Sequence, residues 1–207
     1  MSARLKGKIA LILGAGSVGP GWGNGRAMAV RFAEEGAKVF GVDKDMARMT
    51  ETVERVQAAG GEIETSACDV TQSAQIADVV RLCVEKWGRI DILVNNVGGS
   101  ASGGPVELDE DVWDAQVDSN LKSVFLSCKH VLPVMEKQGN GAIINMSSTS
   151  GTRWTGSAQV AYAATKAGVI QLSKVVAIQY AKKGIRVNTI VPGQLHTPMV
   201  EVRLAGQ

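Results

Sequence analysis

Short apolar runs and amphipathic segments alternate along the whole chain. The first run, residues 9–13, is wholly apolar between a lysine and a glycine, as expected for a strand that is covered on both faces. The predicted strands cover residues 9–13, 38–42, 62–68, 90–95, 142–146 and 186–191. The predicted helices cover residues 26–35, 46–59, 73–87, about 109–137, and 158–183. This alternation predicts an α/β fold in three layers, with helices on both faces of a doubly wound parallel sheet.

Glycine and proline mark the ends and the weak points of the predicted helices. Gly36, Gly60 and Gly88 each follow a helical segment directly, where a residue without a side chain ends a helix most easily. Pro133 lies inside the longest segment and is expected to kink or shorten that helix. No linker, repeat or low-complexity tail divides the 207 residues, so residues 1–207 are predicted to form a single domain.

Composition and charge argue against several classes of protein. Hydrophobic residues make up 45% of the chain and charged residues 20%, as in a folded globular protein rather than a disordered one. The net charge is +2 and the basic residues are scattered, so neither nucleic acid nor a membrane is an expected partner. No apolar run approaches the roughly 20 residues of a membrane span, and the first residues lack the apolar core of a secretory signal. We therefore expect a cytoplasmic protein.

Residues that commonly bind metals are few and scattered. Cys68, Cys83 and Cys128 are odd in number and contain no C-x-x-C pair, so they are expected to be buried, reduced thiols. His130 and His196 have no cysteine or carboxylate companions at ligand spacing. No metal site is therefore expected.

Polar residues and glycines follow the predicted strands at one end. In parallel sheets of this kind, ligands bind beyond the carboxyl ends of the strands. The residues found at those ends are Gly14, Asp43, Asp69, Asn95, Ser147 and Pro192. The sequence therefore predicts a ligand site along that edge of the sheet.

Two glycine clusters separate the first predicted strand from the first predicted helix. One runs from Gly14 to Ser17, and the other is Gly23, Asn24 and Gly25. Glycine lets the backbone approach a pyrophosphate, and a helix N-terminus offers free N–H groups with a partial positive charge. Because ordinary loops also use glycine, it is the position between strand and helix that favours a nucleotide site.

An acidic residue, Asp43, ends the second predicted strand. A carboxylate there can accept both hydroxyls of an adenosine ribose and would repel a 2′-phosphate. The alternative is a solvated turn aspartate beside Lys44. The first interpretation predicts NAD as the cofactor and makes NADP less favourable.

Tyr162 and Lys166 are four residues apart on the fifth predicted helix, so they share one face. A free tyrosine has a pKa of about 10, and making it a base near neutral pH needs about 4 kcal/mol of phenolate stabilisation. An ammonium about 4 Å away supplies a similar amount at an effective dielectric near about 20. Ser147 and Ser148 upstream offer a hydroxyl that could orient a substrate oxygen. This pattern predicts proton transfer, although the same spacing also arises by chance in amphipathic helices.

With these features in place, the chain resembles the short-chain dehydrogenase/reductase family over nearly its whole length. The matching residues are Gly14 through Gly25, Asp69 and Val70, residues 95–98, Asn120, Ser147 and Ser148, Tyr162 and Lys166, and residues 192–197. The resemblance implies a Rossmann-like sheet with strand order 3-2-1-4-5-6 and a single dinucleotide-binding and catalytic domain.

The resemblance also implies roles for the catalytic residues. Tyr162 would be the general acid/base, and Lys166 would lower the pKa of Tyr162 while binding the nicotinamide ribose. Ser148 would hydrogen-bond the reacting oxygen, although Ser147 could be the active hydroxyl instead. Asn120 would anchor a water leading from Lys166 to solvent, unless it merely caps or bridges helices.

Further positions are implied to bind the cofactor. Asp69 would hold the adenine through its carboxylate, and Val70 would pack on that ring. Asn96 and Gly98 would line the ribose side, and Thr197 would help to fix the nicotinamide amide unless it is only a loop residue. The implied cofactor residues are Gly14, Ser17, Asn24, Gly25, Asp43, Asp69, Val70, Asn96, Gly98, Tyr162, Lys166, Pro192, Gly193 and Thr197.

The chain departs from the family pattern in four places. Three residues usually separate the first two glycines, whereas residues 18–22 look inserted here; in a second register, Gly19 and Gly21 would be the later glycines. Leu13 stands where a threonine is usual, and Val97 replaces a customary alanine. The chain also ends at residue 207, where family members usually continue through a substrate-covering region and a seventh strand. We expect a C-terminally shortened record of an ordinary enzyme.

Three functions follow from these observations, in decreasing order of support. The first is hydride transfer between NAD(H) and a small secondary alcohol or ketone, with Tyr162 moving the proton. The second is a dinucleotide-binding or sensing protein whose catalysis is impaired because the C-terminal region is missing. The third is a methyltransferase, which would leave Tyr162, Lys166 and Ser148 unexplained.

Partners and substrate are predicted only in outline. In this family the fourth and fifth helices usually form a dimer contact, so a homodimer or homotetramer is expected. The residues that could serve either that interface or the core are Val124, Cys128, Val169, Leu172 and Val176. The expected pocket wall, residues 99–104 and 152–156 with Trp154, suggests a modest, partly apolar alcohol or carbonyl substrate.

Overall fold

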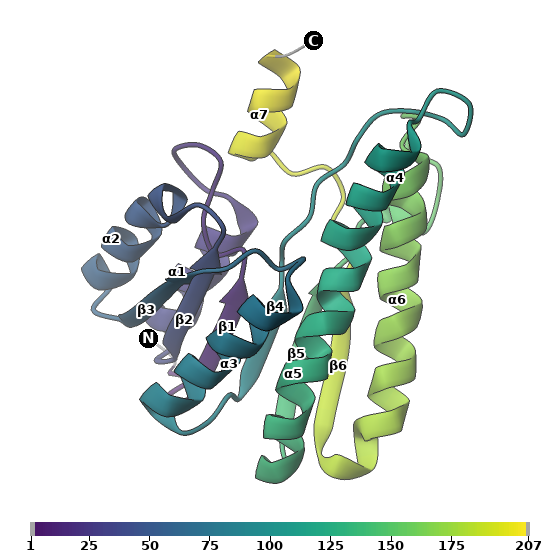
Figure 1. Ribbon diagram of the computed structural model, residues 1–207. Coiled ribbons are helices and arrows are strands. Elements are labelled where there is room, and N and C mark those ends of the chain that lie inside the picture. The colour runs from purple at the N-terminus through teal and green to yellow at the C-terminus, as the bar shows by residue number, and fades with distance from the viewer. Residues whose placement is uncertain (1–2, 206–207) are drawn as a thin grey trace.

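A parallel sheet lies at the centre of the protein. The computed structural model describes residues 3–205 and shows this sheet between two layers of helices (Figure 1). Its strands are β1 (Ile9–Leu13), β2 (Lys38–Asp43), β3 (Glu62–Ala67), β4 (Ile92–Asn95), β5 (Gly141–Met146) and β6 (Ile185–Ile190). They pair in parallel in the order β3-β2-β1-β4-β5-β6. The predicted α/β fold and its strand order are confirmed.

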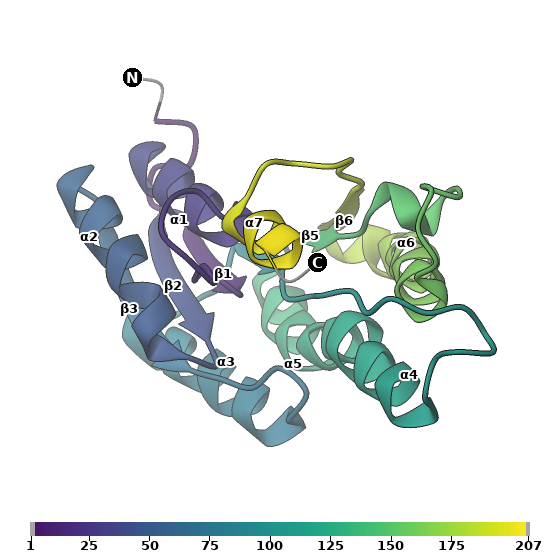
Figure 2. The same ribbon diagram turned by 90° about the horizontal axis from the view of Figure 1, so that it is seen from above.

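Helices lie on both faces of the sheet. They are α1 (Asn24–Glu34), α2 (Thr50–Ala58), α3 (Ser73–Trp87), α4 (Glu110–Val117), α5 (Ser123–Gln138), α6 (Val160–Tyr180) and α7 (Pro198–Ala205). Four short helical turns are η1 (Met46–Met49), η2 (Asp118–Lys122), η3 (Thr149–Gly151) and η4 (Ala181–Lys183). Side chains of α1 and α2 pack on one face, and those of α3, α5 and α6 pack on the other. The view from above shows this division, with α7 over the end of the sheet (Figure 2).

The core forms because each buried strand supplies both faces of the sheet. In β1, Ile9, Leu11 and Leu13 pack against the α3–α5–α6 layer, whereas Ala10 and Ile12 pack against the α1–α2 layer. All five are buried, which explains why the run is apolar without alternation. The helices show the complementary pattern, since α3 buries residues at spacings of three and four.

One predicted helix is divided in the structure, and one helix of the structure was not predicted. The segment predicted as one helix over about 109–137 is divided into α4 and α5 by the π-turn η2, and Pro133 lies inside α5 without ending it. In this turn Ser123 Oγ donates to the Ser119 carbonyl oxygen, at 2.7 Å. The amphipathic pattern runs through the break, so it could not locate the turn. A further helix, α7, begins at Pro198, a favoured first helical residue that we did not use.

The five side chains that could have served an interface belong to the core. Val124, Cys128 and Val169 are buried in the cluster beneath α5 and α6, and the partly buried Leu172 and Val176 pack against that cluster. The exposed apolar side chains of these two helices are Phe125, Val175 and Ile178.

The cysteines, like the core around them, are structural. All three are free and buried, and burial raises the pKa of the Cys83 thiol to about 12.

Over residues 3–205, no helix is both long and apolar enough to cross a membrane. The same residues contain no group of three or more His, Cys, Asp or Glu side chains that could hold a metal ion.

Candidate active site

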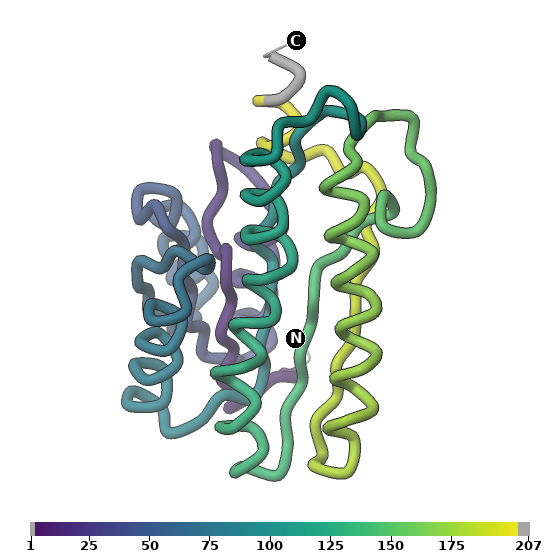
Figure 3. The backbone as a smooth tube through the Cα atoms, turned by 45° about the vertical axis from the view of Figure 1, so that its right-hand side comes forward, coloured from purple at the N-terminus to yellow at the C-terminus, as the bar shows by residue number. Residues whose placement is uncertain are grey.

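The segments that follow the strands meet at one end of the sheet. Figure 3 shows the connections after β1, β4, β5 and β6 approaching one another there. They carry part of the predicted site, which therefore lies along one edge although its residues are far apart in sequence: Gly14, Ser17, Asn96, Gly98, Ser147, Ser148, Pro192 and Gly193.

The glycine turn, which we define as residues 14–17, packs tightly against its neighbours. Gly14 has a φ of +81°, and a Cβ there would lie 2.9 Å from Val97 Cγ2. The Asn96 side-chain amide donates to the Gly14 carbonyl oxygen at 2.8 Å. A Cβ on Gly25 would overlap that same oxygen. Gly23 is the N-cap of α1 and Gly25 lies in its first turn, whereas Gly19 and Gly21 lie in the loop before this helix, which favours the first register.

The N-terminus of α1 is suited to an anion. Asn24 is the first residue of this helix, which has no acidic residue in its first turn, and no side chain among residues 3–205 caps it. The helix dipole and the free N–H groups therefore face the edge where the glycine turn lies. Ser17 lies beside this N-terminus, since a Cβ on Gly23 would be 3.0 Å from Ser17 Oγ. This arrangement fits the pyrophosphate of a dinucleotide.

The insertion is ordered by one buried arginine. We call residues 18–22 the inserted loop. Arg26, on α1, donates to the carbonyl oxygens of Gly19 and Gly21 and pairs with Glu51 of α2 at 2.5 Å. Burial lowers the pKa of Arg26, while the Glu51 carboxylate raises it. Arg26 was not predicted as a site residue, although it lies one turn before Val30 on the buried face of α1, where a charged residue needs partners.

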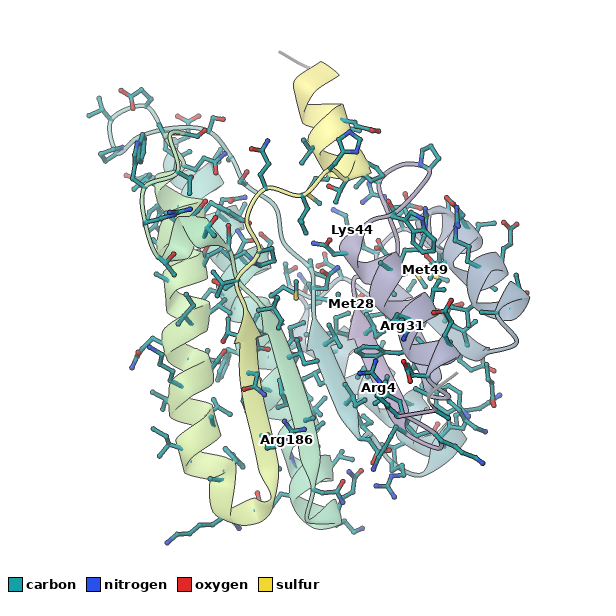
Figure 4. All side chains as sticks on the ribbon, turned by 180° about the vertical axis from the view of Figure 1, so that it is seen from behind. Arg4, Met28, Arg31, Lys44, Met49 and Arg186 are labelled. Atoms are coloured by element: carbon teal, nitrogen blue, oxygen red, sulfur yellow. The ribbon has the colours of Figure 1, made fainter. Side chains whose placement is uncertain are left out.

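Asp43 lies against the glycine turn. A Cβ on Gly16 would be 2.7 Å from Asp43 Oδ2, so only a glycine leaves this carboxylate its place. The backbone N–H of Asp45 donates to Asp43 Oδ1 at 3.2 Å. Lys44, labelled in Figure 4, is exposed at the same end of β2. The position matches the one predicted for a ribose-binding carboxylate.

The residues predicted to contact the adenine follow β3, and those predicted to line the ribose side follow β4. Asp69 Oδ1 accepts hydrogen bonds from the backbone N–H and the hydroxyl of Thr71, and these bonds hold the pKa of Asp69 below its ordinary value. Val70 is buried, and Gly98 lies on the connection after β4. A Cβ on Gly98 would be 2.9 Å from Lys166 Nζ, so this glycine brings the connection close to the lysine.

Lys166 is a buried cation beside Tyr162. Its residue is 3% exposed, its Nζ donates to the Met146 carbonyl oxygen at 2.9 Å, and the Nζ lies 5.6 Å from the centroid of the Tyr162 ring. Burial lowers the pKa of Lys166 to about 8. The ammonium is therefore costly to hold at this position, as expected where a charge is needed for function.

Asn120 lies in the π-turn and faces the same place. Its side chain accepts a hydrogen bond from the Gly99 N–H and donates one to the Gly99 carbonyl oxygen, both at 2.9 Å. A Cβ on Gly98 would be 2.8 Å from Asn120 Oδ1, just as it would approach Lys166 Nζ. Lys166, Asn120 and Gly98 are thus brought together.

The two serines after β5 have different environments. Ser147 is buried, and its hydroxyl donates to the Lys166 carbonyl oxygen at 2.8 Å. Ser148 is partly exposed, and its Oγ accepts from the Ser150 N–H at 3.2 Å. Gly151 was missed: a Cβ there would lie 2.6 Å from the Lys166 carbonyl carbon, so a glycine lets this turn rest on α6.

The residues after β6 divide into two groups. The Pro192 carbonyl oxygen accepts from the Thr149 N–H at 3.0 Å, which places it beside the serines, and Gly193 follows on the surface. Thr197 precedes α7, whose first residue, Pro198, is near the inserted loop: a Cβ on Gly19 would be 3.2 Å from Pro198 Cβ. Thr197 is therefore placed near the glycine end of the site.

Comparison with known proteins identifies the family of this chain. A family model described as short chain dehydrogenase matches residues 8–207. A 3-oxoacyl-[acyl-carrier-protein] reductase from Thermotoga maritima is 41% identical over 198 residues, which are 96% of this chain and 78% of that protein. The crystal structure of a short-chain dehydrogenase/reductase from Burkholderia xenovorans is 60% identical with a TM-score of 0.97, covering 99% of this chain and 78% of that one.

A third comparison concerns the cofactor. The crystal structure of an actinorhodin polyketide ketoreductase with NADPH is 34% identical with a TM-score of 0.90, covering 99% of this chain and 77% of that one. Because the family model and these relatives each match nearly all of the sequence, this chain is a member of the short-chain dehydrogenase/reductase family of oxidoreductases, which bind a nicotinamide dinucleotide.

Proposed function

We propose that this chain transfers a hydride between NAD(H) and a small secondary alcohol or ketone, with Tyr162 as the general acid/base. The observation that carries this proposal is the buried Lys166 ammonium, 5.6 Å from the Tyr162 ring centroid. When bound, the nicotinamide ring gives or takes the hydride. The alcohol proton must move at the same time, and the Tyr162 hydroxyl is the group on α6 suited to carry it.

Ser148 and Asn120 complete the proposed proton path. The Ser147 hydroxyl is already donated to the Lys166 carbonyl, which favours Ser148 as the hydroxyl that orients the substrate oxygen. Asn120, held in the π-turn near Lys166, would anchor a water that leads from the lysine to solvent. Lys166 would also bind the nicotinamide ribose.

The proposed dinucleotide site consists of the cofactor residues that the sequence predicted. The uncapped N-terminus of α1 would face the pyrophosphate, and the Asp43 carboxylate would accept the ribose hydroxyls. The other proposed cofactor residues are Gly14, Ser17, Asn24, Gly25, Asp69, Val70, Asn96, Gly98, Pro192, Gly193 and Thr197.

NAD is proposed in preference to NADP. Arg48 lies near Asp43 and could attract a 2′-phosphate, but it is already paired with Asp45 at 3.2 Å. An added phosphate would have to displace that carboxylate and would also meet the charge of Asp43. The site is therefore better suited to an unmodified ribose.

Asp43→Ser is expected to reverse much of this preference. The ratio of kcat/KM for NAD over NADP should fall about a hundredfold, because two hydrogen bonds to a carboxylate are lost and a repulsive charge is removed. Steady-state kinetics with both cofactors measures the ratio. Asp78→Asn, which removes an exposed partner of Arg81 on α3, is the control and should leave it unchanged. An unaltered ratio in Asp43→Ser would exclude this carboxylate as the selector.

The loops around Tyr162 support a small, partly apolar alcohol or carbonyl compound as the proposed substrate. Residues 152–157 are exposed and include Trp154, and the Gly103 N–H bonds the Ala158 carbonyl oxygen at 2.8 Å, which joins the two loops. Two of the relatives named above, the 3-oxoacyl-[acyl-carrier-protein] reductase and the polyketide ketoreductase, are reductases of carbonyl compounds by their names. Following NADH absorbance across a panel of small ketones and secondary alcohols tests the proposal. Dinucleotide binding without any absorbance change would contradict it.

The exposed side chains of α5 and α6 support a proposed homodimer or homotetramer. Phe125, Val175 and Ile178 are 52%, 52% and 79% exposed, which is unusual for large apolar side chains on two adjacent helices. Light scattering should give at least twice the chain mass, and Ile178→Asp should reduce it to the monomer mass. A monomeric wild-type protein would reject the prediction.

A further inference from the structure

Arg26 connects three segments that surround the adenosine end of the proposed site. Its guanidinium donates to the inserted loop at Gly19 and Gly21, to Thr52 Oγ1 at 3.2 Å, and to the Arg48 carbonyl oxygen at 3.4 Å. The side chain is 2% exposed although it carries a charge. Because Arg26 is buried and makes several hydrogen bonds, it restricts the motion of the inserted loop and of the segment from Arg48 to Thr52.

The segments held by Arg26 are in turn bonded to the glycine turn. The Arg48 carbonyl oxygen also accepts from the Ser17 N–H at 3.3 Å, and Thr52 Oγ1 donates to the Ala15 carbonyl oxygen at 3.0 Å. The turn after β2, residues 44–48, follows Asp43 directly. One guanidinium thus links the glycine turn, the inserted loop and the segment that presents the ribose-binding carboxylate.

Glu51 fixes the same network from the other side. Its carboxylate pairs with Arg26 at 2.5 Å and with Arg55 at 2.7 Å, and it accepts from the Gly21 N–H at 3.4 Å. Arg55 lies 4.4 Å from the ring centroid of Trp22, the last residue of the inserted loop. The inserted loop is therefore held through its carbonyls, its N–H and its aromatic ring.

We propose that Arg26 is a positioning residue for the adenosine half of the dinucleotide. It holds the inserted loop and the turn after β2 against the glycine turn, so that the Asp43 carboxylate and the backbone of the glycine turn face one ribose together. The inference rests on the proposed dinucleotide binding and extends it, because Arg26 and the inserted loop then determine how well that half of the cofactor is held.

Two variants test the role of the network. Glu51→Gln keeps the size of the side chain and removes the ion pair, and Arg26→Lys keeps the charge and removes the planar fork. Each should weaken ADP-ribose binding, measured by calorimetry, and raise KM for NAD about tenfold, with kcat within about twofold of the wild type. If Arg26→Lys does not fold, Glu51→Gln alone carries the test.

The matched control is Glu35→Gln. Glu35 is also a carboxylate paired with two arginines, Arg4 at 2.9 Å and Arg31 at 2.5 Å, at the far end of α1. Figure 4 shows Arg4 and Arg31 well removed from Lys44, which marks the carboxyl end of β2. This variant should leave KM for NAD and ADP-ribose affinity unchanged.

The outcomes separate the two proposals. A loss of folded protein lowers the apparent kcat but does not raise KM for NAD. An unchanged KM for NAD in Glu51→Gln would therefore overturn the role of Arg26. A rise in Glu35→Gln equal to that in Glu51→Gln would overturn it as well. Wild-type protein that fails to bind ADP-ribose would overturn the proposed function, and the inference with it.

Discussion

The Tyr162→Phe protein is expected to fold and to bind the dinucleotide normally, but to turn over about a thousandfold more slowly. General acid/base catalysis by a positioned group is worth about a hundredfold to ten-thousandfold, and this variant removes only the hydroxyl that would carry the proton. The ring remains over Lys166 Nζ, so packing is preserved. Steady-state rates, together with calorimetric binding of NAD, measure the two effects separately.

The chain provides a matched control for this substitution. Tyr180, the second of the two tyrosines, is the last residue of α6 and packs against the core. Tyr180→Phe should turn over at the wild-type rate. Wild-type turnover in folded Tyr162→Phe, or an equal loss in Tyr180→Phe, would show that the proton follows another path.

Lys166→Met is expected to change the pH dependence of stability as well as to slow turnover. Burial lowers the folded-state pKa of Lys166 to about 8, against an ordinary value of 10.5. Below about pH 8 both states hold the proton, so the full cost of burying the charge is present. Above it the unfolded state binds more protons, and this contribution makes the wild-type protein more stable as pH rises toward 10.5.

The difference between the two proteins removes every titration that does not depend on Lys166. From about pH 7 to about pH 9.5, the wild type should gain about 2 kcal/mol of unfolding free energy relative to Lys166→Met. Urea unfolding at each pH measures the free energies, and subtraction removes the titration of the cysteines, which both proteins share. Lys174→Met, at an exposed position on the same helix, should show a constant difference from the wild type. If the difference in unfolding free energy between the wild type and Lys166→Met also stays constant with pH, the pKa of Lys166 is not lowered by burial in the folded protein.

Much of the fold was predictable because burial imposes simple periods on the sequence. The predicted bounds of β1 and α3 agree with the structure, since one is apolar throughout and the other repeats at three and four residues between clear ends. The edge of the sheet that carries the candidate site could also be predicted, because parallel strands place their carboxyl ends together. The spacing of Tyr162 and Lys166 predicted their proximity for the same local reason.

The parts that were missed depend on contacts between distant segments. The π-turn around Asn120 leaves the hydrophobic pattern unbroken, so only the backbone of the folded chain reveals it. The partners of Arg26 come from the inserted loop and from α2, and no local pattern links them. The spacing of hydrophobic residues indicates which face of a helix or strand is buried. It does not indicate which polar group a buried charge will contact.

The most direct test of the account is a crystal structure of the protein with NAD bound. The account predicts that the nicotinamide ring lies in contact with the Tyr162 hydroxyl, with its ribose at Lys166 Nζ and the adenosine ribose at Asp43. A nicotinamide ring bound away from Tyr162, with the tyrosine hydroxyl facing only protein or solvent, would contradict it.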